Sequence, residues 1–97
     1  MPRRNYIVTY DICNDKRLRK VFRLCKGYGE HLQYSVFECD LTEMEKAEME
    51  SRLKEVMNLK EDQVLFIDLG PAAFRSERTI TALGQNYTKV DAPCFVV

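Results

Sequence analysis

The sequence predicts a single α+β domain in which two helices cover one face of a mostly antiparallel sheet. Two amphipathic segments with helix-capping signals alternate with segments rich in β-branched and aromatic residues. The chain has 97 residues, a length typical of one domain with a modest core. No apolar run approaches the roughly 20 residues that a membrane-spanning helix needs, so we expect no membrane association.

Residues 5–12 are expected to form the first strand, because one of its faces carries alternating apolar side chains: Tyr6, Val8, Tyr10 and Ile12. Asn14 is a favourable N-cap for the helix that follows. The buried stripe of that helix is predicted to contain Leu18, Val21, Phe22 and Cys25. Gly27 and Gly29 are expected to end it.

Residues 31–41 form a second extended segment, and Thr42 with Glu45 makes a capping box that opens the second helix. The apolar face of this helix is predicted to contain Met49, Leu53, Val56 and Met57. Residues 62–69 read as a strand whose nearly continuous apolar centre implies burial on both faces. Gly70 and Pro71 are expected to turn the chain into a polar loop at 75–77, before a short strand at 78–83.

This order of elements fits the ferredoxin-like βαββαβ sandwich, provided that residues 29–41 hold two short strands around 33–35. One longer strand is equally compatible with the sequence. We expect one domain over residues 1–97, with a core at 1–78 and C-terminal strands at 79–97. The apolar tail at 93–97 either closes its own sheet or adds to the sheet of a second copy. We favour the second arrangement, a homodimer, because the core is small.

The net charge is zero, but the charges are segregated along the chain. Residues 16–26 contain only basic charges, whereas residues 38–55 are mainly acidic, so we expect two electrostatic faces. The cysteines form no C-x-x-C pair and suit reduced, buried thiols in a cytoplasmic protein. His31, the only histidine, is expected at the surface. The sequence contains no phosphate-binding glycine loop, no Ser/His/Asp set and no zinc-ligand spacing.

Asp11 is the first candidate functional residue, because it ends an apolar strand just before a helix N-terminus. A carboxylate at this place either caps the first turn or holds a cation against a phosphate. Mg²⁺ suits the second role, since it commonly uses one or two carboxylates with phosphate and water. A two-fold dimer would supply Asp11 twice. Asp68 is a further possible ligand.

The first helix is the second candidate, because its face opposite the apolar stripe is basic. Its exposed cations are expected to include Lys16, Arg19 and Lys20, with Arg17 at the border of the stripe. This face is either simply solvated or binds a phosphate backbone. The absence of acidic i, i+4 partners argues against simple solvation, and both possibilities stay open. Gln33 and Ser35 could bind a phosphate or a backbone bend.

Several motifs together resemble the CRISPR-associated protein 2 family. They are Tyr10-Asp11-Ile12, Lys16-Arg17, Lys20-Val21, Gly29 and the run Gln33-Tyr34-Ser35-Val36-Phe37-Glu38, with softer matches near the C-terminus. The resemblance implies a ferredoxin-like homodimer whose last strands reach the other subunit. It also implies a Mg²⁺-dependent endonuclease on RNA or double-stranded DNA, and a spacer-acquisition subunit that binds duplex DNA and bridges dimers of the adaptation integrase.

By the same resemblance, Asp11 is the expected catalytic and metal-binding residue, with one Mg²⁺ shared across the dimer dyad. The nucleic-acid contacts are expected from Tyr10, Lys16, Arg17, Arg19, Lys20 and Ser35. Many family members have an arginine just before the Gln-x-Ser-Val-Phe-Glu run, where this chain has Glu30-His31-Leu32, so the helix cations are expected to carry more of the binding. The alternatives are a purely architectural DNA-binding subunit and a toxin-type ribonuclease of the virulence-associated protein D kind.

Overall fold

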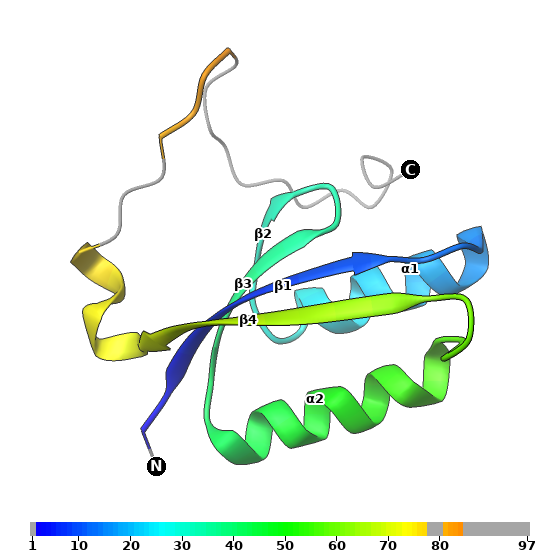
Figure 1. The fold of residues 1–97 in the computed structure, drawn as a ribbon, viewed down its shortest axis with the longest axis horizontal. Coiled ribbons are helices and arrows are strands. Elements are labelled where there is room, and N and C mark those ends of the chain that lie inside the picture. Colours follow the sequence, from blue (N-terminus) through cyan, green and yellow to red (C-terminus); the bar gives the residue numbers. More distant parts are fainter. Residues whose placement is uncertain (1, 78–80, 85–97) are drawn as a thin grey trace.

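The computed structural model describes residues 2–77 and 81–84. Its elements follow the order β1 (Arg4–Asp11), α1 (Asp15–Lys26), β2 (Glu30–Gln33), β3 (Val36–Leu41), α2 (Glu43–Val56), β4 (Gln63–Pro71) and a final 3₁₀ helix η1 (Ala72–Glu77). Residues 29–41 therefore hold two strands, and the βαββαβ arrangement is confirmed. The strands form one antiparallel sheet in the order β2-β3-β1-β4, and Figure 1 shows both helices lying along it.

The two helices begin where their capping residues predict. The side chain of Asn14 accepts a hydrogen bond from the Arg17 N–H at 3.0 Å, which satisfies one of the free donors of the first turn. Thr42 and Glu45 form the expected reciprocal capping box at the start of α2. Gly27 is the C-cap of α1. Within the described residues, no helix is long and apolar enough to cross a membrane.

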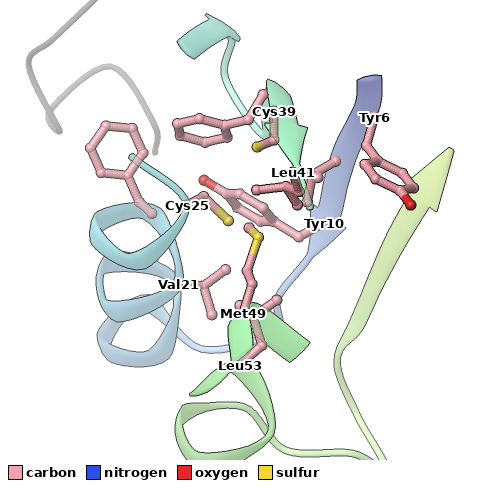
Figure 2. Close-up of a cluster of buried hydrophobic side chains, with 11 residues drawn as sticks. Tyr6, Tyr10, Val21, Cys25, Cys39, Leu41, Met49 and Leu53 are labelled. Carbon is pink, nitrogen blue, oxygen red and sulfur yellow. The ribbon is translucent and has the colours of Figure 1, made fainter. Parts of the chain in front are cut away.

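The core lies between the two helices and one face of the sheet. Its buried residues come from alternate positions of β1 and β3 and from the inner stripes of both helices: Tyr6, Val8, Tyr10, Val21, Phe22, Cys25, Phe37, Cys39, Leu41, Met49 and Leu53. Most of these side chains are labelled in Figure 2. The predicted partners Ile12, Leu18, Val56 and Met57 are partly buried and pack against this cluster. The predicted apolar faces are thus confirmed.

Strand β4 differs from the prediction in burial and in length. Leu65, Ile67 and Leu69 are exposed, because both helices pack on the opposite face of the sheet and the side chains of a strand alternate between its faces. Burial on both faces is therefore wrong for this chain. The strand also continues through Gly70 to Pro71, which pairs with Arg4, in place of the predicted turn, and the predicted loop at 75–77 belongs to η1.

Two further expectations concern the C-terminal part. The described residues 81–84 contain a bend and no strand, so the short strand expected at 78–83 is not formed there. Residues 78–80 and the tail at 93–97 lie outside the described residues. The expected strand exchange with a second copy lies there as well.

Candidate nucleic-acid and metal site at the end of strand β1

Asp11 ends β1 at an edge where several functional candidates meet. Its side chain is exposed, and within the described residues its carboxylate makes no hydrogen bond or ion pair. On one side the register places it opposite Gln63, the first residue of β4. On the other side the Tyr10 N–H donates to the Ser35 carbonyl at 3.2 Å, so the β2–β3 turn lies beside Asp11. The first residue of α1, Asp15, follows four residues later.

The carboxylate of Asp11 suits a hard cation, since it is accessible and has no partner among the described residues. The described residues contain no group of three or more His, Cys, Asp or Glu side chains that could hold a metal ion. A metal site built on Asp11 within one chain therefore has at most one further ligand of these types among the described residues. Mg²⁺ commonly takes one or two protein carboxylates and completes its shell with water and phosphate, so the residues fit Mg²⁺ best when a second copy contributes its own Asp11.

Asp68 does not belong to this site. It lies opposite Tyr6, five positions along β4 from the residue that faces Asp11, or about 16 Å at the usual strand rise. Both of its oxygens accept hydrogen bonds from Arg4 Nε, at 3.1 and 2.9 Å. The bond from Arg4 holds the pKa of this carboxyl below its ordinary value. Its interpretation as a second metal ligand is wrong for this chain.

Three of the predicted helix cations are available for a ligand. Lys16, Arg19 and Lys20 are exposed, and they form no ion pair with other described residues. Arg23 extends the same face toward the end of α1 and is likewise exposed without an ion pair among the described residues. Unneutralised cations on one helix face are suited to successive phosphates of a nucleic-acid backbone.

Arg17 is placed differently from the other cations. Its Nε donates to Oδ2 of Asp62 at 2.8 Å, its Nη2 donates to Oδ1 of Asp62 at 3.1 Å, and a further bond from Nη2 reaches Glu61 at 3.1 Å. Its side chain is 24% exposed and that of Asp62 is 0% exposed. The guanidinium already has carboxylate partners, so Arg17 supports the fold of the site rather than offering a free charge to a phosphate.

The structure places Tyr10 in the core, which corrects its expected role as a nucleic-acid contact. Its side chain is buried and its ring stacks on Phe37, with ring centroids 6.2 Å apart. Figure 2 shows the ring extending from β1 toward Cys25 of α1. The hydroxyl has no hydrogen-bond partner among the described residues, and burial raises the pKa of Tyr10 well above its ordinary value. A nucleic-acid ligand outside the domain does not reach this side chain.

Asp62 is the residue that sequence reasoning missed. Besides Arg17, its carboxylate accepts hydrogen bonds from the backbone N–H groups of Cys13 at 3.0 Å and Asn58 at 2.8 Å. These bonds hold the pKa of Asp62 far below its ordinary value, with the Arg17 bond the largest cause. They tie the β1–α1 connection to the α2–β4 connection. The signal in the sequence was Arg17 itself, a cation at the border of an apolar stripe, where it requires an acidic partner.

His31 is buried, which corrects its expected place at the surface. It is 5% exposed and lies between two rings, with centroids 5.0 Å from Phe22 and 4.8 Å from Phe37. Its Nε2 donates to the carbonyl of Tyr34 at 2.7 Å. The histidine therefore anchors the β2–β3 turn to the core. Ser35, a predicted contact, is half-buried in that turn.

The sequence comparison gives the family. The family model described as CRISPR associated protein Cas2 matches residues 4–76, a range that includes Asp11, the basic helix and the β2–β3 turn. The chain belongs to the Cas2 family. The CRISPR-associated endoribonuclease Cas2 of Geobacter sulfurreducens is 39% identical over 92 residues, which are 95% of this chain and 96% of that protein. Its counterpart Cas2 1 from Rhodospirillum rubrum is 36% identical over 95% of this chain and 89% of its own.

Solved structures agree with this Cas2 assignment. The crystal structure of Streptococcus pyogenes Cas2 at pH 6.5 has a TM-score of 0.69 and 35% identity, and the match covers 82% of this chain and 99% of that one. A hypothetical protein from Thermus thermophilus has a TM-score of 0.73 and 31% identity over 91% of this chain and 99% of its own. Membership of the Cas2 family favours a CRISPR role over the toxin-type alternative.

Proposed function

We propose that this protein is a Mg²⁺-dependent endoribonuclease of a CRISPR system that acts as a homodimer on the phosphate backbone. The observation that carries the proposal is that Asp11 is an accessible carboxylate, followed five positions later by the first of several exposed cations. Neither Asp11 nor these cations has an ion-pair partner among the described residues. The names of the relatives, CRISPR-associated endoribonucleases, support the reaction.

In this proposal the α1 cations bind the nucleic-acid backbone and Asp11 binds the metal ion. Lys16, Arg19 and Lys20 neutralise successive phosphates and position the strand along α1. Asp11 from each subunit holds Mg²⁺. When bound, this ion supplies charge stabilisation at the scissile phosphate and lowers the pKa of its water. The Asp62 carboxylate keeps the loop after Asp11 in place through the Cys13 N–H.

The homodimer is supported by the face of the sheet that the helices leave uncovered. Leu65 and Ile67 of β4 are 45% and 46% exposed, and the register pairs them with Thr9 and Ile7 of β1. Side chains paired in an antiparallel ladder point to the same face. Large apolar side chains gathered on one open sheet face mark an interaction surface. A second copy fits it, because symmetric self-association also supplies the second Asp11.

Asp11→Asn tests the reaction, because the substitution removes the charge from an exposed side chain without a described partner and leaves the fold intact. We expect the variant to lose Mg²⁺-dependent cleavage of labelled single-stranded RNA by at least about 100-fold, as loss of a metal's electrostatic contribution implies. Asp15→Asn, an exposed acid four residues along, is the matched control and should keep its activity. Equal cleavage by wild type and Asp11→Asn would exclude the proposed reaction.

A second candidate is an architectural subunit that holds duplex DNA without cutting it and bridges integrase dimers. The single carboxylate per chain favours it, because it is a small catalytic set. The same Asp11→Asn variant distinguishes the two functions. The architectural role predicts that duplex binding and spacer acquisition survive the substitution, whereas a catalytic role in acquisition predicts that acquisition is lost with cleavage.

A further inference from the structure

An exposed aromatic side chain lies beside the proposed metal ligand. Tyr34 is 64% exposed and occupies the turn between β2 and β3. The last ladder pair of β3 with β1 is Val36 with Thr9, and the Tyr10 N–H then donates to the Ser35 carbonyl. Asp11 follows Tyr10 and Tyr34 precedes Ser35, so each residue lies one position from this contact, at the same end of the sheet. The site therefore combines a carboxylate and an aromatic ring at one end of the sheet.

The backbone of Tyr34 does not favour a tyrosine. Its φ is +22°, in the region that residues with a side chain adopt rarely. Tyr34 is the first central residue of a two-residue hairpin turn, a place where glycine, asparagine or aspartate usually supplies a positive φ. A local rule broken in this way is typical of a functional position. The geometry of the turn thus gives no reason for the aromatic ring.

The β2–β3 turn is attached to the core through His31. The carbonyl of Tyr34 accepts a hydrogen bond from His31 Nε2 at 2.7 Å, and His31 is packed between Phe22 and Phe37 in the core. The Tyr34 ring is therefore exposed on a backbone that the core holds in place. A ring presented on a fixed backbone loses little conformational entropy when a flat ligand stacks on it.

We infer that Tyr34 is a stacking platform for an unpaired base of the nucleic acid whose backbone binds along α1. This inference rests on the proposed function and adds to it a residue that contacts a base, whereas the α1 cations contact the backbone. Bases in a duplex are already stacked on their neighbours, whereas an unpaired base gains a partner from an exposed ring whatever its sequence. Tyr34 then acts as a specificity residue that brings unpaired nucleotides next to Asp11.

Binding measured without cleavage tests the inference. Fluorescence anisotropy in EDTA at fixed salt would compare a labelled single-stranded RNA with an RNA duplex of the same length. We expect Tyr34→Ala to weaken single-strand binding about 5- to 30-fold, the effect of one lost base–aromatic stack, and duplex binding less than about 2-fold. Tyr34→Phe should bind like wild type. Phe74→Ala, which removes another exposed aromatic ring, is the matched control and should change neither affinity.

Tyr34→Gly separates binding from folding. Glycine accepts the positive φ, so this variant should be at least as stable as wild type in thermal unfolding and still lose single-strand affinity. Equal single-strand affinity of wild type and Tyr34→Ala, or an equal loss for single strand and duplex, would overturn the inference and leave the proposed function standing. A wild-type protein that binds neither ligand would overturn both.

Discussion

Arg17 and Asp62 form a two-bond pair, in which Nε and Nη2 of the guanidinium each donate to one carboxylate oxygen, at 2.8 and 3.1 Å. The carboxylate also accepts the backbone N–H groups of Cys13 and Asn58. One buried side chain thus connects α1 with the two loops that flank the end of β1. The position of Asp11, two residues before Cys13, depends on this connection.

The first prediction concerns stability at neutral pH. Asp62→Asn leaves Arg17 facing a neutral group in a buried place, so we expect the free energy of unfolding at pH 7 to fall by about 3 kcal/mol. Urea unfolding followed by circular dichroism measures this change. Glu61→Gln, which removes the other, exposed partner of Arg17, is the control and should change the stability little.

The same pair predicts a pH dependence. The folded-state pKa of Asp62 is depressed, so its stabilisation is fully present above the unfolded-state pKa of about 4. Below that pH the unfolded chain takes up the proton first, and the stabilisation decreases as the pH falls toward the folded-state pKa. The difference between wild type and Asp62→Asn should therefore be smaller at pH 3 than at pH 7. A constant difference would contradict this explanation.

Tyr10→Phe should have almost no cost. The hydroxyl is buried and has no hydrogen-bond partner in the part of the chain that the structure describes. Its removal should therefore leave the free energy of unfolding unchanged or raise it by up to about 1 kcal/mol. Nucleic-acid binding should also be unchanged, since the residue faces the core. Tyr28→Phe is the contrast, because the Tyr28 hydroxyl donates to Glu48. A loss of nucleic-acid affinity in Tyr10→Phe would restore its predicted role as a contact.

A charge on the open face of the sheet should separate the two subunits. Ile67→Lys introduces an ammonium group among the apolar side chains of β4, and we expect sedimentation velocity to show a monomer where wild type shows a dimer. Leu59→Lys changes an exposed apolar residue outside the strands in the same way, and this control variant should remain dimeric. Mg²⁺-dependent cleavage should be lost together with the dimer, because each monomer keeps only one Asp11.

The exposed cations of α1 predict the salt dependence of binding. Arg19→Glu and Lys20→Glu should each weaken RNA binding and reduce the slope of log affinity against log salt by about 1. Lys54→Glu, an exposed position on α2, has the same charge change and should leave that slope unchanged. Filter binding at several salt concentrations measures both quantities. If all three variants kept the slope of the wild type, the α1 face would not contact phosphates.

Local signals in the sequence were sufficient for most of the fold. Asn14, Thr42 and Glu45 cap the helices as predicted because capping depends on residues close in sequence. The sequence does not decide where β2 ends and β3 begins, because Tyr34 and Ser35 include no glycine or proline to mark a turn. Their turn is fixed instead by His31 from the core, which is a tertiary contact.

The candidate site was predicted less completely, and for a similar reason. The position of Asp11 at the end of the first strand, just before a helix, follows from local signals in the sequence. Sequence reasoning predicts Arg17 as a ligand contact because its partner Asp62 lies 45 residues away in sequence. It predicts the same for Tyr10 because of the motif that this residue shares with Asp11, although alternation with Val8 places Tyr10 on the core face.

The cysteines of this domain differ sharply in access. Cys25 and Cys39 are buried, and burial raises the pKa of each thiol to about 12, whereas Cys13 is exposed. Since only a thiolate is an effective nucleophile, an alkylating reagent should modify Cys13 at once and the two core thiols only when the domain opens. A Cys94→Ser variant would remove the fourth cysteine of the sequence. In that variant, the rate at which the reagent labels Cys25 and Cys39 would measure how often α1 separates from the sheet.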